Sequence, residues 1–212
     1  MTGRRRRARQ AEFAFRTWGG RRKHAGRKPK GERSGVSHAR RPRVLPTTPV
    51  HVTLKMARHV FNLRARRCFT VVERALYAGA ERAGMRLVRF SVQGDHVHLL
   101  VEAKDGLALA RGVQGLTVRL AFALNRVMQR RGRVFADRYH AHVLKTPTEV
   151  RRALAYLRNN FQRHRAQATG ARALTLPGWV DPCSSERAPP ERLPSPMSWL
   201  LGRAIRDEDR RA

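Results

Sequence analysis

The sequence predicts an α+β fold, because segments of strand-like and helix-like periodicity follow one another in the order β-α-β-β-α-β. Alternating apolar residues indicate the strands, and apolar residues three and four apart indicate the helices. The strands are expected at 50–56, 86–93, 96–102 and 140–145, and the helices at 70–84 and from Asp105 to just before Gly132. We therefore expect a ferredoxin-like core, an antiparallel sheet with helices on one face, followed by a further C-terminal helix.

The two helices of this core are predicted from their apolar faces. In the first, Val72 and Leu76 begin a stripe that continues through Ala80 and Ala83, and Gly84 is expected to end the helix. In the second, Asp105 is the expected N-cap. The apolar stripe of the second helix consists of Val113, Leu116, Leu120, Leu124 and Val127.

The start of the further helix is predicted by a run of capping residues. Thr146-Pro147-Thr148-Glu149 places a capping Thr first, a Pro at the first helical position and a Glu three residues after the cap. The apolar face of this helix consists of Val150, Leu154, Leu157 and Phe161. It is followed, after about residue 168, by a segment rich in Pro, Ser and Arg.

Composition divides the chain into three parts. Residues 1–48 contain runs such as Arg4-Arg5-Arg6-Arg7 and little apolar periodicity, which predicts a disordered basic arm. We expect the catalytic domain at 49–168 and an irregular C-terminal tail at 169–212. No apolar run reaches the roughly 20 residues that a membrane helix needs, so no membrane partner is expected.

The net charge indicates the partner. The 212 residues include 46 Lys and Arg against 15 Asp and Glu, a formal net charge of +31. A folded domain does not need this excess, and a polyanion is its natural counterpart, so we expect a nucleic acid. The two cysteines, Cys68 and Cys183, lack the spacing of a metal site or a disulfide framework, which is typical of a reducing cytoplasm.

The most informative motif is His96-Val97-His98. It follows a predicted Gly94-Asp95 turn, at the start of a strand. Since residues two apart in a strand share a face, both imidazoles are expected to project together and to supply two ligands of a metal site. A buried pair of structural histidines is the alternative. A second pair, His140 and His142, is expected at the surface, with a place on the same sheet face or a phosphate contact as the alternative. His51 is expected to be structural.

Tyr156 and Asn160 are four residues apart on the further helix and share a face on its flank, beside the apolar stripe. A tyrosine can attack a phosphodiester and form a stable but reversible phosphotyrosine link, while an amide oxygen can complete a metal shell. Tyr77 is expected to pack in the core. Tyr139, beside Arg138 and His140, is the second candidate nucleophile.

Between residues 49 and 165 the sequence resembles the HUH-type tyrosine transposases that act on single-stranded DNA, especially the REP-associated tyrosine transposases. The resemblance rests on four segments. They are Pro49-Val50-His51-Val52-Thr53, Gly94-Asp95-His96-Val97-His98-Leu99-Leu100-Val101, Phe135-Ala136-Asp137-Arg138-Tyr139-His140 and Tyr156-Leu157-Arg158-Asn159-Asn160.

The resemblance implies a function for the candidate residues. His96, His98 and Asn160 would ligate Mg²⁺ or Mn²⁺, and Tyr156 would attack DNA beside an imperfect hairpin, leaving a 5′-phosphotyrosine and a free 3′-hydroxyl. The sequence departs from the family at Asp95, where Asn is common, and at Phe161, where Pro is common. The second departure predicts a helix that continues past residue 160.

Four basic residues are candidate DNA contacts, and a solvated surface charge is the alternative for each. They are Arg138, Lys145, Arg158 and Arg163. We therefore predict a metal-dependent single-strand DNA endonuclease and strand transferase, acting as a monomer or homodimer in the bacterial cytoplasm at the nucleoid. A non-catalytic nucleic-acid-binding module of ferredoxin-like fold, or a decayed transposase, is the alternative from another class. A nuclease that uses water would retain the histidines but would not need Tyr156.

Overall fold

The structure is a computed structural model that describes residues 43–169 and 179–210. These residues belong to one of the two compact units of the chain, Val36–Ala212. Most of the predicted basic arm thus lies outside the described residues. Its last part does not: Val44 is 6% exposed and packs in the core, so the domain begins before residue 49.

The observed elements confirm the α+β fold. They are β1 (Val50–Lys55), α1 (Arg66–Ala78), β2 (Glu81–Arg82), β3 (Met85–Val92), β4 (His96–Ala103), α2 (Gly106–Val127), β5 (His140–Val143), α3 (Pro147–Thr169) and α4 (Trp199–Asp209). Short 3₁₀ turns lie at Ser185–Arg187 and Pro190–Arg192. The sheet order is β2-β3-β4-β1-β5, and each paired neighbour is antiparallel. The extra strand β2 extends the predicted core.

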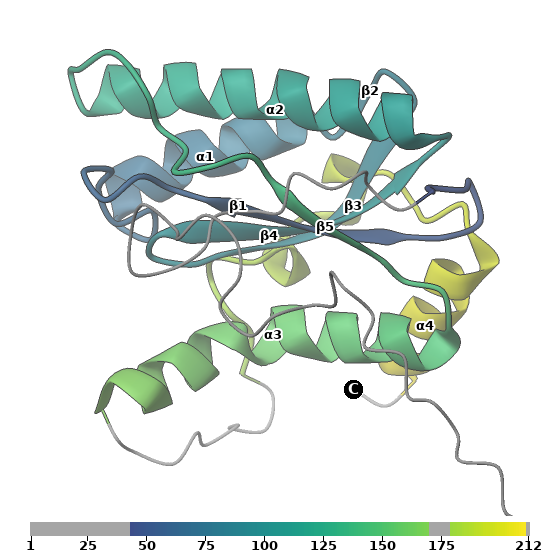
Figure 1. Cartoon of the computed structure of the whole chain (residues 1–212). Helices are drawn as coiled ribbons and strands as arrows, with labels where there is room; N and C mark the ends of the chain where they lie inside the picture. The colour runs from purple at the N-terminus through teal and green to yellow at the C-terminus, as the bar shows by residue number, and fades with distance from the viewer. Residues whose placement is uncertain (1–42, 170–178, 211–212) are drawn as a thin grey trace, which may run out of the picture. The chain divides into compact units, whose positions relative to one another are not determined.

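Helices cover both faces of the sheet (Figure 1). The sequence predicted helices on one face only. Helices α1 and α2 pack on one face, over the larger hydrophobic cluster, and α3 and α4 pack on the other. On β4, Val97, Leu99 and Val101 belong to the first cluster and Leu100 to the second. Alternate residues of this central strand therefore face different helices, and the His96/His98 face is the one that α3 covers.

The predicted buried face of the second strand is interrupted by a register shift. Val88, Phe90 and Val92 are all buried, but Val88 packs with α3 while Phe90 and Val92 pack with α1 and α2. The pairing with β4 shifts between Leu87 and Arg89, which inserts a residue and changes the face of those that follow.

The first helix begins and ends earlier than its apolar pattern predicts. It ends at Gly79 rather than Gly84, and Ala80 accepts a hydrogen bond from Leu87 N, which draws the chain into the β2–β3 hairpin. Ala83 is exposed, with a φ of 52°, and belongs to the hairpin turn rather than to the helical stripe. A Cβ on Gly79 would lie 2.7 Å from Leu116 Cδ1, so the glycine also permits α1 and α2 to approach.

The predicted helix starts at Asp105 and Thr146 are confirmed. Asp105 Oδ1 accepts a hydrogen bond from Ala108 N at 2.7 Å. Thr146 Oγ1 accepts one from Glu149 N at 3.2 Å, while the Glu149 carboxylate accepts one from Lys145 N. Helix α3 does continue past Asn160, to Thr169.

Helix α2 is long and apolar enough to cross a membrane by length and composition. Its buried residues pack instead on the sheet and on α1, as those of a core helix do. They include Leu109, Val113, Leu116, Leu120 and Leu124.

The C-terminal segment is ordered rather than irregular where the structure describes it. Residues 181–185 run along the open edge of β3: Val92 N donates to Cys183 O at 2.8 Å, and Phe90 N donates to Ser185 Oγ at 2.9 Å. Helix α4 then buries Leu201 and Ile205 against α3 and the sheet. The segment lacks a long periodic pattern, so the sequence did not predict its role.

Candidate active site

The two histidines of the His96-Val97-His98 motif project from β4 toward α3, as the strand period predicts. Their ring centroids are 4.7 Å apart and their planes are nearly perpendicular, at 85°. His98 is buried, with 4% of its surface exposed, and the His96 side chain is 16% exposed. The pair is thus largely shielded from water but open on one side.

Asp95 holds the first histidine. Its Oδ1 lies 2.6 Å from His96 Nδ1. Partial burial acts to raise the pKa of the Asp95 carboxyl, but the hydrogen bond to His96 and the charges of His96 and Lys55 leave it below its usual value. Asp95 is therefore ionised at neutral pH and can only accept a hydrogen bond, which places the proton of a neutral His96 ring on Nδ1.

The second histidine contacts β1. His98 Nδ1 lies 3.1 Å from His51 Nε2 and 3.2 Å from Thr53 Oγ1. Burial lowers the pKa of His98 to about 2, and it lowers the pKa of His51 to about 4, with added repulsion from nearby histidines. Both rings are neutral at pH 7. His51 was expected to be structural, because the sequence does not reveal the pairing register between β1 and β4 that brings it to His98.

Helix α3 presents a stripe of polar side chains to this pair. Tyr156 Oη lies 3.4 Å from His98 Nε2, and the two rings meet edge to face with centroids 5.0 Å apart. Asn160 is 1% exposed, one turn further along. His164, another turn on, has its ring centroid 5.2 Å from that of His96. The residues predicted to act together do lie together, and His164 is an addition that the sequence did not indicate.

Burial holds the Tyr156 side chain as a phenol. Its pKa is raised because the ionised form would lose solvation, although the positive charge of Arg163 and the nearby Asn160 amide act in the opposite direction. Any reaction in which the phenol oxygen attacks therefore needs its proton to leave. The nearest ring nitrogen is His98 Nε2.

The other two tyrosines lie away from the histidine pair. Tyr77 packs edge to face on Phe90, with ring centroids 5.8 Å apart, and donates a hydrogen bond to Glu73. Its predicted packing role is confirmed. Tyr139, the second candidate nucleophile, is half-buried against the cluster beneath α1 and α2. Tyr156 is thus the tyrosine that the fold brings to the site.

A divalent cation needs several ligand atoms directed at one point. In residues 43–169 and 179–210, no group of three or more His, Cys, Asp or Glu side chains could hold a metal ion. Asn160 belongs to none of those types, and its buried Nδ2 has no hydrogen-bond partner in the part of the chain that the structure describes. Two imidazoles and the oxygen of a buried side-chain amide are types of ligand that a divalent metal accepts.

The four candidate DNA contacts differ in their surroundings. Arg138, Lys145 and Arg163 are exposed. Arg158 instead lies between two carboxylates, with Nε 2.7 Å from Glu186 and Nη2 3.4 Å from Glu208. These ion pairs join α3 to the C-terminal segment, so a DNA contact by Arg158 would have to compete with them.

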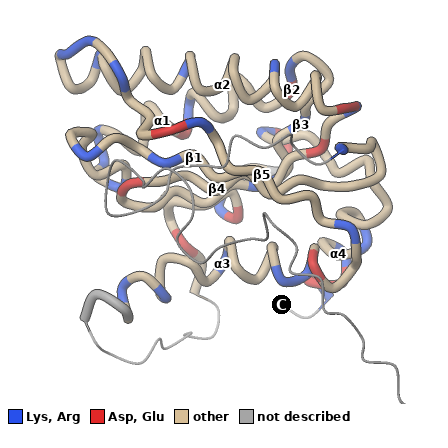
Figure 2. Tube along the Cα trace, viewed as in Figure 1, with Lys and Arg blue, Asp and Glu red and all other residues tan. Residues whose placement is uncertain are grey.

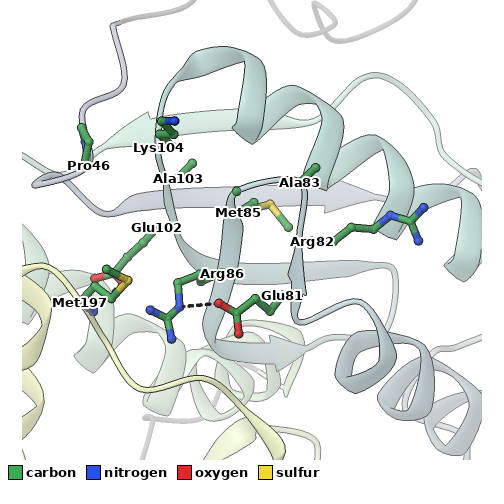
Figure 3. A pocket seen from close by; sticks show the side chains of 11 residues that line it. Pro46, Glu81, Arg82, Ala83, Met85, Arg86, Glu102, Ala103, Lys104 and Met197 are labelled. Carbon is green, nitrogen blue, oxygen red and sulfur yellow. Dashed lines mark hydrogen bonds and ion pairs between the residues drawn. The ribbon is translucent and has the colours of Figure 1, made fainter.

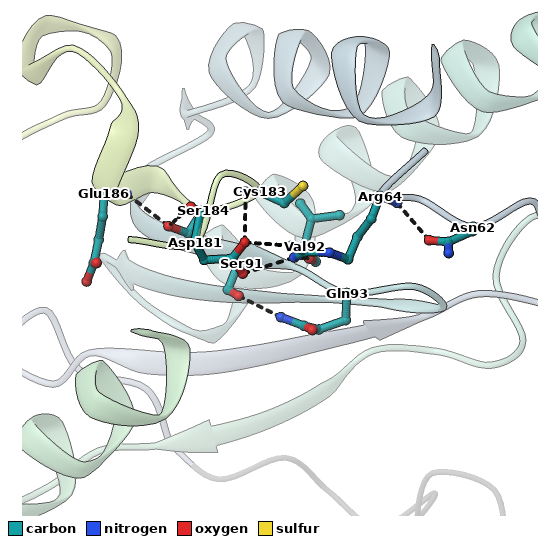
Figure 4. Close-up of polar contacts among 9 residues, drawn as sticks. All are labelled: Asn62, Arg64, Ser91, Val92, Gln93, Asp181, Cys183, Ser184 and Glu186. Carbon is teal, nitrogen blue, oxygen red and sulfur yellow. Dashed lines mark hydrogen bonds and ion pairs between the residues drawn. The ribbon is translucent and has the colours of Figure 1, made fainter. Parts of the chain in front are cut away.

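A buried ion pair between Arg64 and Asp181 lies beside the end of β3 (Figure 4). Arg64 makes two hydrogen bonds to Asp181, at 2.7 and 2.9 Å, and a third to Val92 O. Its guanidinium also lies 3.6 Å from the centroid of the Phe161 ring, which stacks on Trp179. Because Phe161 follows Asn160 directly, this contact holds the helix close to the site. We call Arg64, Asp181, Phe161 and Trp179 the Arg64 clamp.

A pocket of about 500 Å³ lies elsewhere, between the β2–β3 turn, the end of β4 and Met197 (Figure 3). An ion pair of 3.3 Å between Arg86 and Glu81 lies along it. None of the histidines or Tyr156 lines this pocket. The candidate chemistry lies on the sheet face beneath α3.

A histidine pair on the central strand β4 thus faces a tyrosine on helix α3, on one side of an antiparallel sheet. The family model described as "Transposase IS200 like" matches residues 50–160, slightly more than half of the chain. The chain belongs to this family of transposases.

A solved structure supports the fold. A REP-associated tyrosine transposase bound to a REP hairpin is similar over 70% of this chain and 82% of its own, with 13% identity and a TM-score of 0.51. A putative transposase from Deinococcus radiodurans is similar over 50% of this chain and 86% of its own, with 18% identity and a TM-score of 0.40. No curated protein matches the chain.

Proposed function

We propose that this transposase is a metal-dependent endonuclease and strand transferase for single-stranded DNA, with Tyr156 as its nucleophile. The observation that supports this most directly is the juxtaposition of Tyr156 Oη with His98 Nε2, at 3.4 Å, beside the buried Asn160. A phenol can act as the nucleophile and a bound metal can polarise the phosphate, and this arrangement supplies a phenol beside candidate ligands for the metal.

In the proposed step, Tyr156 Oη attacks the phosphorus of a DNA phosphodiester. A bond forms between Oη and phosphorus, and the bond from phosphorus to the 3′ oxygen breaks. The phenol gives up its proton, and the leaving 3′ oxygen takes one up as a hydroxyl. The product is a 5′-phosphotyrosine, which a later 3′-hydroxyl can attack to release Tyr156 and rejoin the strand.

His96, His98 and Asn160 would hold the divalent metal, Mg²⁺ or Mn²⁺, which transposases of this class use. Such an ion polarises the scissile phosphate and stabilises charge on the leaving oxygen. Asp95 supports the site by orienting His96 through its Nδ1. His98 is buried and Tyr156 is half-buried, which would limit competing attack by water at the same phosphorus.

We propose that the DNA substrate contains a hairpin, because the structurally similar transposase is bound to one. Lys and Arg outnumber Asp and Glu along the described trace, which favours a polyanion (Figure 2). Exposed Arg163, near Tyr156 on α3, would contact the backbone at the cleaved phosphate. The protein would act on such DNA in the bacterial cytoplasm, as a monomer or a homodimer.

A denaturing gel tests the proposal. Purified protein is mixed with labelled single-stranded hairpin oligonucleotides and Mn²⁺, and the wild type is compared with Tyr156→Phe and His96→Ala. Tyr77→Phe, which removes a phenol hydroxyl on the other face of the sheet, is the matched control. We expect a protein–DNA adduct that needs metal, is absent from both site variants and persists in the control.

Two other outcomes would each replace the proposal. Cleavage without an adduct that survives Tyr156→Phe would indicate a nuclease that uses water. If the protein binds a panel of hairpins tightly even at high salt but cleaves none of them, it is a binding module.

A further inference from the structure

His98 is contacted at both of its ring nitrogens, and the two sets of contacts differ in kind. Nε2 faces Tyr156 Oη and the open side of the site. Nδ1 faces the sheet, where His51 Nε2 lies at 3.1 Å and Thr53 Oγ1 at 3.2 Å. The orientation of this ring is therefore determined from β1, the strand next to β4.

The register of the sheet creates these contacts. Thr53 of β1 lies directly opposite His98 of β4, and His51 lies two residues away on the same face of β1. A diagonal neighbour of this kind is within reach of a long or aromatic side chain. The His51 and His98 ring centroids are 5.1 Å apart.

A neutral imidazole has one N–H and one lone pair, so the partner at one nitrogen determines what the other presents. When His51 Nε2 has its lone pair, it accepts a hydrogen bond from His98 Nδ1–H. His98 Nε2 then has its lone pair directed at the site. Thr53 fits either form of His98, because a hydroxyl can donate or accept, whereas each tautomer of His51 fits only one form of His98.

His96 provides an internal comparison. Its Nδ1 faces the Asp95 carboxylate at 2.6 Å, and a carboxylate only accepts, so the neutral form of this ring has its lone pair on Nε2. The two histidines of the pair would then present equivalent nitrogens to the same place, one held by a carboxylate and one by an imidazole.

We propose that His51 is a positioning residue that holds His98 in the Nδ1–H form, so that both histidines of the pair present Nε2 lone pairs to one cation. The inference rests on the metal-dependent function proposed above and adds a residue from β1 to it. Partners of metal-binding histidines typically change metal affinity by 10- to 100-fold when they are removed.

The first test reads the position of the proton without metal. In protein labelled with ¹⁵N, long-range proton–nitrogen spectra at pH 7.5 distinguish the protonated from the unprotonated nitrogen of His98. We expect the proton on Nδ1 in the wild type and in His51→Gln, whose amide oxygen still accepts. We expect a mixture of both forms in His51→Leu. A proton on Nε2 in the wild type would overturn the proposal.

The second test measures Mn²⁺ affinity by electron paramagnetic resonance, with no DNA present. His51→Leu should bind Mn²⁺ about 10- to 100-fold more weakly, and His51→Gln should restore affinity to within about threefold. His142→Leu is the matched control, since it removes an exposed imidazole from the residue paired with His51 on β5. Unchanged Mn²⁺ affinity in a folded His51→Leu would overturn the proposal.

The remaining outcomes are separable. If His51→Leu does not fold, as judged by circular dichroism, Thr53→Val decides: the proposal requires that this variant keep the Nδ1–H form, and its loss would transfer the role to Thr53. If the wild type does not bind Mn²⁺, the metal role in the proposed function is wrong, while the proton position still decides the role of His51.

Discussion

At the scale of single residues, burial determines how the site responds to acid. His51 and His98 are neutral in the fold because charging either would place an imidazolium away from water, among other histidines. In the unfolded chain, both would take up protons near pH 6.5. The unfolded state therefore binds more protons than the native state as the pH falls below 6.5, and acid destabilises the fold.

We predict that the free energy of unfolding falls by a few kcal/mol, about 2 to 4, between pH 7.5 and pH 5.0. The loss begins near pH 6.5 and continues toward pH 4, the lowered pKa of His51. In His51→Gln the loss should be smaller, by about 2 kcal/mol. Urea unfolding at the two pH values measures it. An equal loss in the variant and the wild type would contradict this origin of the pH dependence.

Single-residue reasoning from the sequence identified part of the site. The period of two in a strand predicted that His96 and His98 share a face, and the period of the helix predicted the same for Tyr156 and Asn160. His51 was not identified, because its contact with His98 depends on the register between β1 and β4. That register is set by the packing of both sheet faces and is not contained in either strand alone.

At the scale of elements, the position of α3 depends on the C-terminal segment. The segment pairs with the edge of β3, and the Arg64 clamp connects it to Phe161 on α3. Ion pairs from Arg158 to Glu186 and Glu208 add a second connection. The sequence predicted an irregular tail here, because short strand-like and 3₁₀ segments have no period long enough to detect.

We predict that Asp181→Ala lowers the free energy of unfolding by about 3 kcal/mol, because it leaves the Arg64 guanidinium partly buried without its partner. The Asp181 side chain is fully buried and that of Arg64 is 13% exposed. Asp207→Ala is the control, since it breaks an exposed pair with Arg203 and should change stability by less than about 1 kcal/mol. Equal effects in urea unfolding would show that the clamp contributes no more than a surface pair.

The packing of α2 on the sheet gives another prediction. A Cβ on Gly112 would lie 2.5 Å from Met85 Cβ, which cannot move without β3. A Cβ on Gly115 would meet only the mobile end of Arg82, at 3.4 Å. Gly112→Ala should therefore destabilise the protein by about 1 to 3 kcal/mol, while Gly115→Ala should be neutral or stabilising by up to about 1 kcal/mol. Thermal unfolding of both variants tests this, and equal midpoints would contradict it.

At the scale of the whole molecule, the net charge of +31 implies DNA binding that weakens steeply with salt. The charge alone does not say which face binds. The proposed function places the DNA on the α3 side of the sheet, where Tyr156 and Arg163 lie, and leaves the α2 side free.

We predict that Arg163→Gln reduces the slope of log affinity against log salt by about 0.7, the value for one phosphate contact on a single strand. Arg111→Gln removes the same charge from the exposed side of α2, on the other face of the sheet, and should leave the slope unchanged. Fluorescence anisotropy with a hairpin oligonucleotide measures both. Equal reductions would mean that DNA binds over the whole surface.

Antiparallel order and the α+β class followed from the order of the periodic segments, and they are confirmed. Which face each helix covers did not follow, because α3 leaves β5 by a short connection that permits either face. The site exists only because α3 covers the face opposite α1 and α2.

The most direct measurement of the central claim is the identity of the residue that becomes linked to DNA. The adduct formed with Mn²⁺ and a hairpin oligonucleotide is treated with nuclease and trypsin, and the peptides are sequenced by mass spectrometry. Cleavage after Arg152 and Arg158 isolates Tyr156 on a peptide of its own, separate from Tyr77 and Tyr139. We predict a nucleotide attached to Tyr156 through a phosphodiester. A nucleotide on Tyr139, or on any other residue, would contradict the account.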